Sequence, residues 1–318
     1  MAASPSASAG VHGISSFSGR SMGSRLVLQV AGGSAADAEV AWVRASMEMA
    51  AAEAALSRFR EDSALTRLNA AVGSAAPSVV DRRLRRMLAL AHRAQRLTGG
   101  RFDPRTLEVM EALGERAGVR YTAPAAPPLR CDTTWLRRAG REQLWIDAPI
   151  DSGGLGKGLG LRWALDAARR AAPRASGLLL DAGGDVVTDG RPRDADAWQI
   201  GIEDPSGSGE PLAVVAIRGG ALATSSTAVR SWRAPDGSLA HHLIDPRTWR
   251  PADGGLRAVT VAHADPAWAE IWSKALFVGG ARSLGPEARA RGMAAWWIEE
   301  DESLHLTPAA AAMTIWQR

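Results

Sequence analysis

The chain has 318 residues, of which 46% are hydrophobic and 23% charged, and this composition excludes a fibrous, collagenous or wholly disordered protein. A formal net charge of +4 is too small over this length to indicate a nucleic-acid partner. The single cysteine, Cys131, cannot form an internal disulfide or a cysteine-rich metal cluster, and it is consistent with a reducing compartment.

The N-terminal residues are small and polar, with no basic segment followed by an apolar core, so no secretory signal is expected. The sequence contains no run of about 18 apolar residues that would predict a transmembrane helix. We therefore expect a cytoplasmic protein without membrane insertion, in which residues 1–18 are disordered and residues 19–318 form one domain.

Strand-like and helix-like patterns alternate along the rest of the chain, which predicts a single large α+β domain. Residues 81–97 have the clearest helical period, with Asp81 as a candidate N-cap. Residues 121–130, rich in proline and alanine, predict a surface connection. The expected strands cover residues 25–30, 144–146, 177–180, 198–202, 212–217, 257–263 and 294–298, and the other expected helices cover residues 36–59, 158–172 and 267–277.

Residues 151–159 form a glycine-rich turn, D-S-G-G-L-G-K-G-L, between a short strand and a helix. Closely approaching glycine N–H groups and a helix N-terminus favour an anion, so the turn predicts a phosphate or diphosphate site with Lys157 as its cation. Asp151 and Gly158 exclude a P-loop, and leucines at 159 and 161 exclude the dinucleotide fingerprint. The alternative is a plain turn with a solvent-facing lysine, although Lys157 and Lys274 are the only lysines in an arginine-rich chain.

Residues 242–248 read H-L-I-D-P-R-T, with His242 three residues before Asp245. A histidine can accept a proton near neutral pH and a neighbouring carboxylate can orient it, so His242 is a candidate base. The alternative is a structural histidine at a strand end. The chain has no G-x-S-x-G elbow for a serine hydrolase, and its histidine spacing does not fit a zinc site.

Three other segments carry polar groups beside apolar runs. Residues 223–230 (ATSSTAVR) place consecutive hydroxyls before an arginine and could hydrogen-bond a phosphate or a ring edge. Residues 102–103 put an aromatic ring and a carboxylate on a turn after the 81–97 helix. The glycine pair at 183–184 suggests close approach of the backbone to another group.

Taken together, eight segments in order resemble the ApbE-type flavin transferases, the family of FAD:protein FMN transferases. They are M-G-S at 22–24, S-R-F-R-E-D-S-A-L-T-R-L-N at 57–69, G-G-R-F-D-P at 99–104, D-S-G-G-L-G-K-G at 151–158, L-D-A-G-G-D at 180–185, T-S-S at 224–226, H-H-L-I-D-P-R-T at 241–248, and V-T-V with A-E-I-W-S-K-A-L at 259–276.

The resemblance implies an α+β domain with a mixed or antiparallel sheet and flanking helices. Its implied activity is transfer of FMN from FAD to a threonine of an acceptor flavoprotein, in a short Asp-Gly-x-Thr-type motif, with release of AMP. The implied catalytic residues are His242, Asp245 and Lys157, and Mg²⁺ would be held at Gly154, Glu270 and Lys274. The implied FAD-binding residues are Met22, Phe59, Arg101, Phe102, Asp103, Asp151, Lys157, Gly183, Gly184, Thr224, Ser225 and Ile244.

The sequence departs from the family pattern at three positions. Trp249 and Ser226 stand where the family has glycines, and Trp249 predicts a turn with ordinary backbone angles or an aromatic lid. Lys274 stands at a metal-ligand position one turn after Glu270, and an ammonium repels Mg²⁺. We hypothesise that Lys274 occupies the metal position, pairs with Glu270 and faces the diphosphate. The alternative is an outward-pointing Lys274 with water as the missing ligand.

A threonine hydroxyl is a poor nucleophile and needs a base, and a diphosphate being cleaved needs a cation. These requirements fit His242 and the lysines, so we expect FMN transfer from FAD. The alternatives are an FAD-binding protein that has lost transfer and an FAD diphosphatase in which water attacks.

Overall fold

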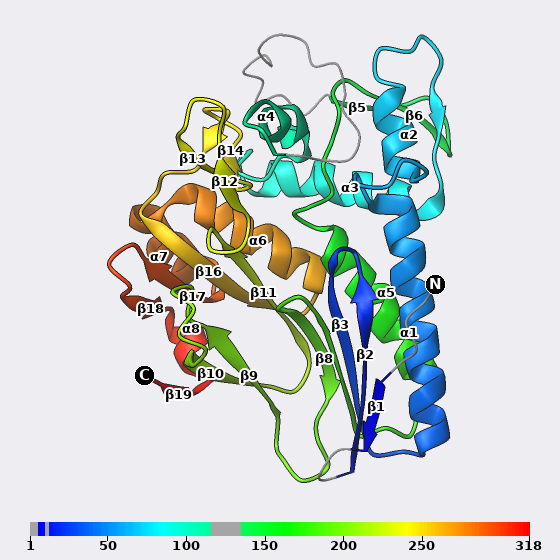
Figure 1. Ribbon diagram of the computed structural model, residues 1–318, viewed down its shortest axis with the longest axis vertical. Helices are drawn as coiled ribbons and strands as arrows, with labels where there is room; N and C mark the ends of the chain where they lie inside the picture. Colours follow the sequence, from blue (N-terminus) through cyan, green and yellow to red (C-terminus); the bar gives the residue numbers. More distant parts are fainter. Residues whose placement is uncertain (1–5, 10–12, 116–134) are drawn as a thin grey trace.

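The computed structural model describes residues 6–9, 13–115 and 135–318, and these form one α+β domain built on an antiparallel sheet (Figure 1). The order across this sheet is β1-β2-β3-β7-β8-β11-β16-β17-β18. Its strands are β1 (Ser6–Ala9), β2 (Ile14–Ser21), β3 (Ser24–Ala31), β7 (Gly177–Ala182), β8 (Asp185–Gly190), β11 (Gly220–Ser226), β16 (Leu256–His263), β17 (Ala294–Glu299) and β18 (Leu304–Leu306).

The two faces of the sheet are covered differently, as the side-chain alternation of β7 illustrates. Leu178 and Leu180 pack with apolar residues of α1 and α5, whereas Leu179 packs on the opposite side with β9 and β10. β9 (Trp198–Glu203), β10 (Pro211–Ile217) and β19 (Thr314–Gln317) form a separate small sheet. The helices are α1 (Ala35–Leu56), α2 (Ala64–Ala70), α3 (Arg82–Leu97), the 3₁₀ turn η1 (Pro104–Thr106), α4 (Leu107–Ala112), α5 (Gly156–Ala171), α6 (Pro266–Gly279), α7 (Ala281–Ala290) and α8 (Pro308–Ala311).

Small residues let α5 pack closely against its neighbouring helices. A Cβ added at Gly160 would lie 3.1 Å from Met49 Sδ on α1. A Cβ added at Gly158 would lie only 2.6 Å from the backbone nitrogen of Ala267 on α6. The start of α5 is therefore held directly against the start of α6, which fixes where the glycine-rich turn lies.

Three smaller sheets and α4 lie toward one end of the molecule, at the top of Figure 1. These sheets pair β4 (Ser78–Val79) and β5 (Leu136–Arg138) with β6 (Gln143–Ile146), β12 (Ser231–Arg233) with β13 (Leu239–His241), and β14 (Ile244–Asp245) with β15 (Arg250–Pro251). Among the described residues, no helix combines the length and the apolar character needed to cross a bilayer.

The strands and helices expected from the sequence are present, with shifted ends. Asp81 is confirmed as an N-cap, because its Oδ1 accepts a hydrogen bond from the N–H of Leu84 at 2.8 Å. The helix expected over 36–59 instead ends at Leu56, because Ser57 has extended backbone angles. The connection expected over residues 121–130 lies outside the described residues.

The disorder expected over residues 1–18 is wrong for the part that enters β2. Residues 14–18 pair with residues 27–31 of β3, and Phe17 is buried with its ring stacked on Trp42 at 6.0 Å between centroids. This buried aromatic contact explains why the segment is ordered. Residues 6–9 pair with residues 15–18 as an added edge strand.

Candidate active site

The glycine-rich turn runs from Asp151 into α5 and is anchored by buried polar contacts. Ser152 donates its hydroxyl to the carbonyl of Leu56 at 2.6 Å, and Asp151 Oδ1 lies 2.9 Å from Arg58 Nε. Burial opposes the ionisation of Asp151, but the charges of Arg58 and Lys274 outweigh it and lower the pKa of Asp151. Asp151 is therefore an ionised, internally compensated carboxylate that holds the turn.

Lys157, in the first turn of α5, forms an ion pair with Asp185 at the start of β8. Burial alone would lower the pKa of Lys157, but the charges of Asp185 and Glu270 outweigh it and raise the pKa. Asp185 Oδ1 also accepts a hydrogen bond from the N–H of Thr224 at 3.2 Å. The structure thus joins the glycine-rich turn to β8 and β11, as a common site requires.

Glu270 on α6 is buried beside this pair. Its Oε2 accepts a hydrogen bond from the N–H of Gly158 at 2.9 Å. Burial and the negative charge of Asp185 raise the pKa of Glu270 to about 8, against the opposing charge of Lys157. Near pH 7 this carboxyl therefore binds a proton more readily than an exposed glutamate does.

The turn between β7 and β8 depends on two glycines with positive φ, 66° at Gly183 and 92° at Gly184. The N–H of Gly184 donates to Asp181 Oδ1 at 2.9 Å. A Cβ at Gly183 would lie 2.7 Å from Ser24 Oγ, so this glycine allows the β2–β3 turn to approach. The glycine pair at 183–184 predicted a close approach of the backbone to another group, and the contact between Gly183 and Ser24 confirms it.

Met22 lies in that β2–β3 turn with a φ of 50°. Its N–H donates to Glu53 Oε2 at 3.0 Å, and its Sδ would lie 3.4 Å from a Cβ at Gly160. Met22 therefore packs toward α5 at the glycine-rich turn. Glu53, which fixes this turn, had no sequence signal of its own because it lies within an alanine-rich helix.

Thr224 and Ser225 on β11 point to opposite faces of the sheet. Thr224 is exposed and its Oγ1 lies 2.8 Å from Thr260 Oγ1. Ser225 is buried and its Oγ lies 2.9 Å from Ser273 Oγ on α6. Thr224 is thus the more accessible of the two hydroxyls.

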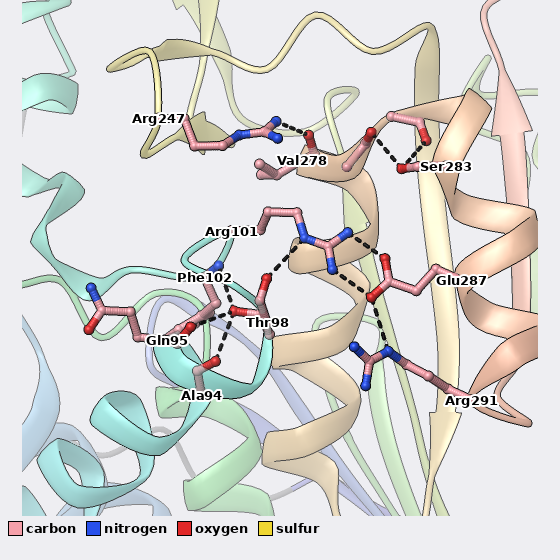
Figure 2. Close-up of polar contacts among 12 residues, drawn as sticks. Ala94, Gln95, Thr98, Arg101, Phe102, Arg247, Val278, Ser283, Glu287 and Arg291 are labelled. Carbon is pink, nitrogen blue, oxygen red and sulfur yellow. Dashed lines mark hydrogen bonds and ion pairs between the residues drawn. The ribbon is translucent and has the colours of Figure 1, made fainter. Parts of the chain in front are cut away.

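The segment after α3 places Phe102 against the glycine-rich turn, and Figure 2 shows how its backbone is held. The N–H of Phe102 donates to Thr98 Oγ1 at 3.1 Å, and a Cβ at Gly154 would lie 2.9 Å from Phe102 Cε2. Arg101 turns the other way and forms an ion pair with Glu287 of α7 (Figure 2). The structure therefore brings Phe102, but not the Arg101 side chain, to the turn.

Asp103 is buried and uses its carboxylate within its own segment. It lies 2.7 Å from Arg105 Nη2, accepts from Gln95 Nε2 at 2.6 Å and caps η1 through the N–H of Arg105. These contacts explain why a carboxylate lies beside Phe102, because Asp103 is held by groups of its own segment and of α3. They leave Asp103 as a residue that shapes this segment rather than one with a free carboxylate.

His242 lies between β13 and β14, with Nδ1 3.4 Å from the carbonyl oxygen of Arg230. A carbonyl only accepts, so Nδ1 carries the proton and Nε2 keeps its lone pair. Burial, together with the charges of Arg230 and Lys274, holds the pKa of His242 well below its usual range. His242 is therefore neutral near pH 7.

Asp245 does not orient His242, contrary to the interpretation of the H-x-x-D spacing. Its carboxylate forms an ion pair with Arg247 at 2.7 Å and accepts the N–H of Arg247 at 2.9 Å. The tight turn at residues 245–249 directs the Asp245 carboxylate toward Arg247. Ile244 is buried with Leu107 and Met110, so it supports α4 rather than facing outward.

Two residues that the sequence analysis did not single out connect the turn to the histidine segment. Arg58 lies 2.6 Å from Glu115, and Glu115 forms a second ion pair with Arg230. Phe59 is 55% exposed, and the Arg58 guanidinium lies 4.4 Å from its ring centroid. Because Arg58 and Glu115 are far apart in the chain, only the fold shows that they meet.

Trp249 has a φ of 56°, so the expectation of ordinary backbone angles at this position is wrong. Its N–H donates to the carbonyl of Asp245 at 2.8 Å, which closes the tight turn. The ring packs against the buried cluster that contains Leu107 and Ile244. The turn keeps the left-handed geometry that suits a glycine although the residue is a tryptophan.

The residues implied for Mg²⁺ do not fit that ion. Lys274 Nζ would lie 3.0 Å from a Cβ at Gly154, so an ammonium lies beside the backbone where a metal would need oxygen ligands. Within the described residues, no group of three histidine, cysteine or carboxylate side chains could hold a metal. Lys274 faces the turn, so the outward-pointing alternative is wrong. Its charge interacts favourably with that of Glu270, but among the described residues the two side chains form no direct ion pair, contrary to the expected pairing.

Comparison with known proteins finds relatives of this chain. The chain is 32% identical over 262 residues to the FAD:protein FMN transferase of Treponema pallidum, covering 72% of this chain and 68% of the relative. It is 26% identical over 298 residues to the enzyme of the same name from Salmonella typhimurium, covering 89% and 83% of the two chains.

Solved structures show the same fold. The ApbE protein of Thermotoga maritima superimposes with a TM-score of 0.82 at 23% identity, covering 94% of this chain and 98% of that one. The flavin transferase ApbE of Vibrio cholerae gives a TM-score of 0.79 at 22% identity, covering 97% and 100%. The ApbE family model matches residues 22–297, and the chain therefore belongs to the ApbE family.

Proposed function

We propose that this protein transfers FMN from FAD to a threonine hydroxyl of an acceptor protein and releases AMP. The observation that carries this proposal is a histidine whose Nδ1 lies 3.4 Å from a backbone carbonyl, which leaves Nε2 as an acceptor, together with two lysines at the glycine-rich turn. Relatives of this chain that carry the name FAD:protein FMN transferase support the same assignment.

His242 acts as the general base. Its Nε2 lone pair accepts the proton of the threonine hydroxyl as Oγ attacks the phosphorus of the FMN half of FAD. The new Oγ–P bond forms while the P–O bond to the AMP half breaks, and the bonding electron pair leaves on the AMP phosphate. The hydrogen bond from Nδ1 to the Arg230 carbonyl fixes the tautomer that this step needs.

The diphosphate binds at the glycine-rich turn, where Lys157 and Lys274 offer positive charge. Asp185 holds Lys157 in place through its ion pair. Phe102 and Met22 pack against the same turn and provide apolar surface for the flavin or adenine rings. Among the described residues no group of three histidine, cysteine or carboxylate side chains could hold a metal, so the lysines supply the positive charge at this turn.

The test is AMP release from FAD by the purified protein, with mass analysis of a peptide that contains an Asp-Gly-x-Thr motif. The expected result is AMP release together with a peptide mass gain equal to one FMN. AMP and free FMN with an unchanged peptide would show a diphosphatase. FAD binding without AMP would show a binding protein, and either outcome would overturn the transferase proposal.

A further inference from the structure

Lys274 places an ammonium beside the glycine-rich turn without a carboxylate partner. A Cβ added at Gly154 would lie 3.0 Å from Lys274 Nζ and 3.1 Å from its Cδ, and 2.9 Å from Phe102 Cε2. Across residues 6–9, 13–115 and 135–318, no carboxylate lies within ion-pair distance of Nζ. A partly buried cation of this kind is poised to receive an anion.

The carboxylates around Lys274 are each engaged by another group. Asp151 lies 2.9 Å from Arg58, and Asp185 pairs with Lys157. Glu270 accepts the N–H of Gly158 at 2.9 Å, and its raised pKa reduces its negative charge near neutral pH. Lys274 therefore interacts with Asp151 and Glu270 only at a distance, and among the described residues its ammonium makes no direct ion pair with a carboxylate. Burial lowers the pKa of Lys274, as expected for an ammonium without a contact partner.

A divalent cation cannot share this position. Mg²⁺ requires six oxygen ligands at about 2.1 Å, and Lys274 supplies a nitrogen that carries protons and positive charge. The same ammonium can donate up to three hydrogen bonds to phosphate oxygens. The position thus suits a phosphate directly and excludes a metal that would bridge to one.

We propose that the Lys274 ammonium takes the place of a divalent cation against the diphosphate of FAD, so that this protein binds FAD without a metal ion. The proposal rests on the proposed function only in taking FAD as the ligand. It makes Lys274 a substrate-binding residue that also neutralises the diphosphate as AMP leaves.

The test measures FAD affinity by isothermal titration calorimetry in EDTA and in MgCl₂. The wild-type protein is expected to bind FAD equally, within twofold, in both solutions. K274M keeps a side chain of similar length but removes the charge, and it should bind FAD at least tenfold more weakly. R282M removes a charge from an exposed residue of α7 and should bind like the wild type. Wild-type affinity that falls tenfold in EDTA, or K274M affinity equal to wild type, would overturn the proposal.

A second readout follows the metal itself. K274T restores an oxygen at this position, so Mn²⁺ added to the FAD-loaded variant should give the electron paramagnetic resonance signal of a bound ion, whereas the wild type should not. Mn²⁺ bound by the wild-type complex, or none bound by K274T, would overturn the proposal. The measurements on the wild-type protein test the proposal even if a variant does not fold.

The two proposals can fail separately. If FAD does not bind in either solution, the proposed function fails with this one. If FAD binds in EDTA but no FMN reaches the peptide, the transferase proposal fails while the role of Lys274 in binding stands.

Discussion

Arg58 Nε lies 2.9 Å from Asp151 Oδ1, and the two side chains are 2% and 4% exposed. This buried pair ties the end of α1 to the glycine-rich turn. Arg58 also holds Glu115, so one guanidinium compensates two carboxylates that come from different parts of the fold.

Replacing Arg58 by methionine should therefore remove the ion-pair partner of buried Asp151 and leave Glu115 with Arg230 alone. We expect the R58M substitution to lower the free energy of unfolding by about 3–5 kcal/mol, the usual cost of removing one partner of a buried pair. Urea denaturation followed by circular dichroism measures this. R60M is the matched control, because Arg60 and Asp62 form an exposed pair whose loss should not change stability measurably. Equal stabilities of R58M and R60M would contradict the prediction.

Trp249 provides a test of backbone strain. Both W249G and W249A remove the ring from its cluster, but only glycine adopts a φ of 56° without cost. We expect W249G to be more stable than W249A by about 1 kcal/mol, measured from thermal or urea unfolding. Both variants lack the tryptophan ring, so the difference in their stabilities reports only the backbone. A more stable W249A would show that the turn changes its backbone angles to suit alanine.

Much of the fold could be predicted from the sequence because its elements carry local patterns. The helix 82–97 has a regular apolar period and an aspartate cap, and the strand 256–263 is nearly continuous in β-branched and apolar residues. β11, which reads G-A-L-A-T-S-S, has no such pattern. It is a strand because β8 and β16 pair with it on either side.

The candidate site was predictable only in part. The resemblance of short segments to a known family located the glycine-rich turn, His242 and Lys274. The structure places Lys274 beside Gly154 of this turn, and the charge of Lys274 acts on His242. The spacing of His242 and Asp245 indicated a contact that the structure does not contain, since the turn aims Asp245 at Arg247. The Arg58–Glu115 pair spans 57 residues, and no local pattern reports such a contact.

Gly158 shows why a glycine in a helix can be essential. A glycine-to-alanine change inside a helix normally stabilises it by about 1 kcal/mol. At Gly158 the new Cβ would lie 2.6 Å from the carbonyl oxygen of Pro266, which is backbone and cannot move aside. We expect G158A to destabilise the protein by about 1–3 kcal/mol and to weaken FAD binding, because the Glu270 contact shifts.

The control for this variant is G160A, two residues along α5. The alanine Cβ at position 160 would lie 3.1 Å from Met49 Sδ and 3.4 Å from Met22 Sδ, and these flexible side chains can move. G160A should therefore cost less than G158A in urea unfolding. The reverse order would show that α5 and α6 are free to separate.

His242 makes a prediction about pH. Only its neutral form can accept a proton, and burial with the charges of Arg230 and Lys274 holds its pKa well below 6.5. Protonation of His242 should therefore not slow FMN transfer to the peptide between pH 8 and 6.5, and the acid limb that depends on His242 should lie at lower pH. H242Q should reduce the rate by about 10²–10⁴ while FAD affinity, measured by calorimetry, stays near that of the wild type.

The matched control for H242Q is the neighbouring His241, whose ring lies 6.2 Å from that of Phe277. H241Q removes an adjacent imidazole that has no assigned part in the transfer, so its rate and pH profile should follow those of the wild type. An acid limb centred at or above pH 6.5 would mean that His242 keeps an ordinary pKa during turnover. A transfer rate unchanged in H242Q would mean that the threonine proton leaves to another group, because glutamine cannot accept it at this pH.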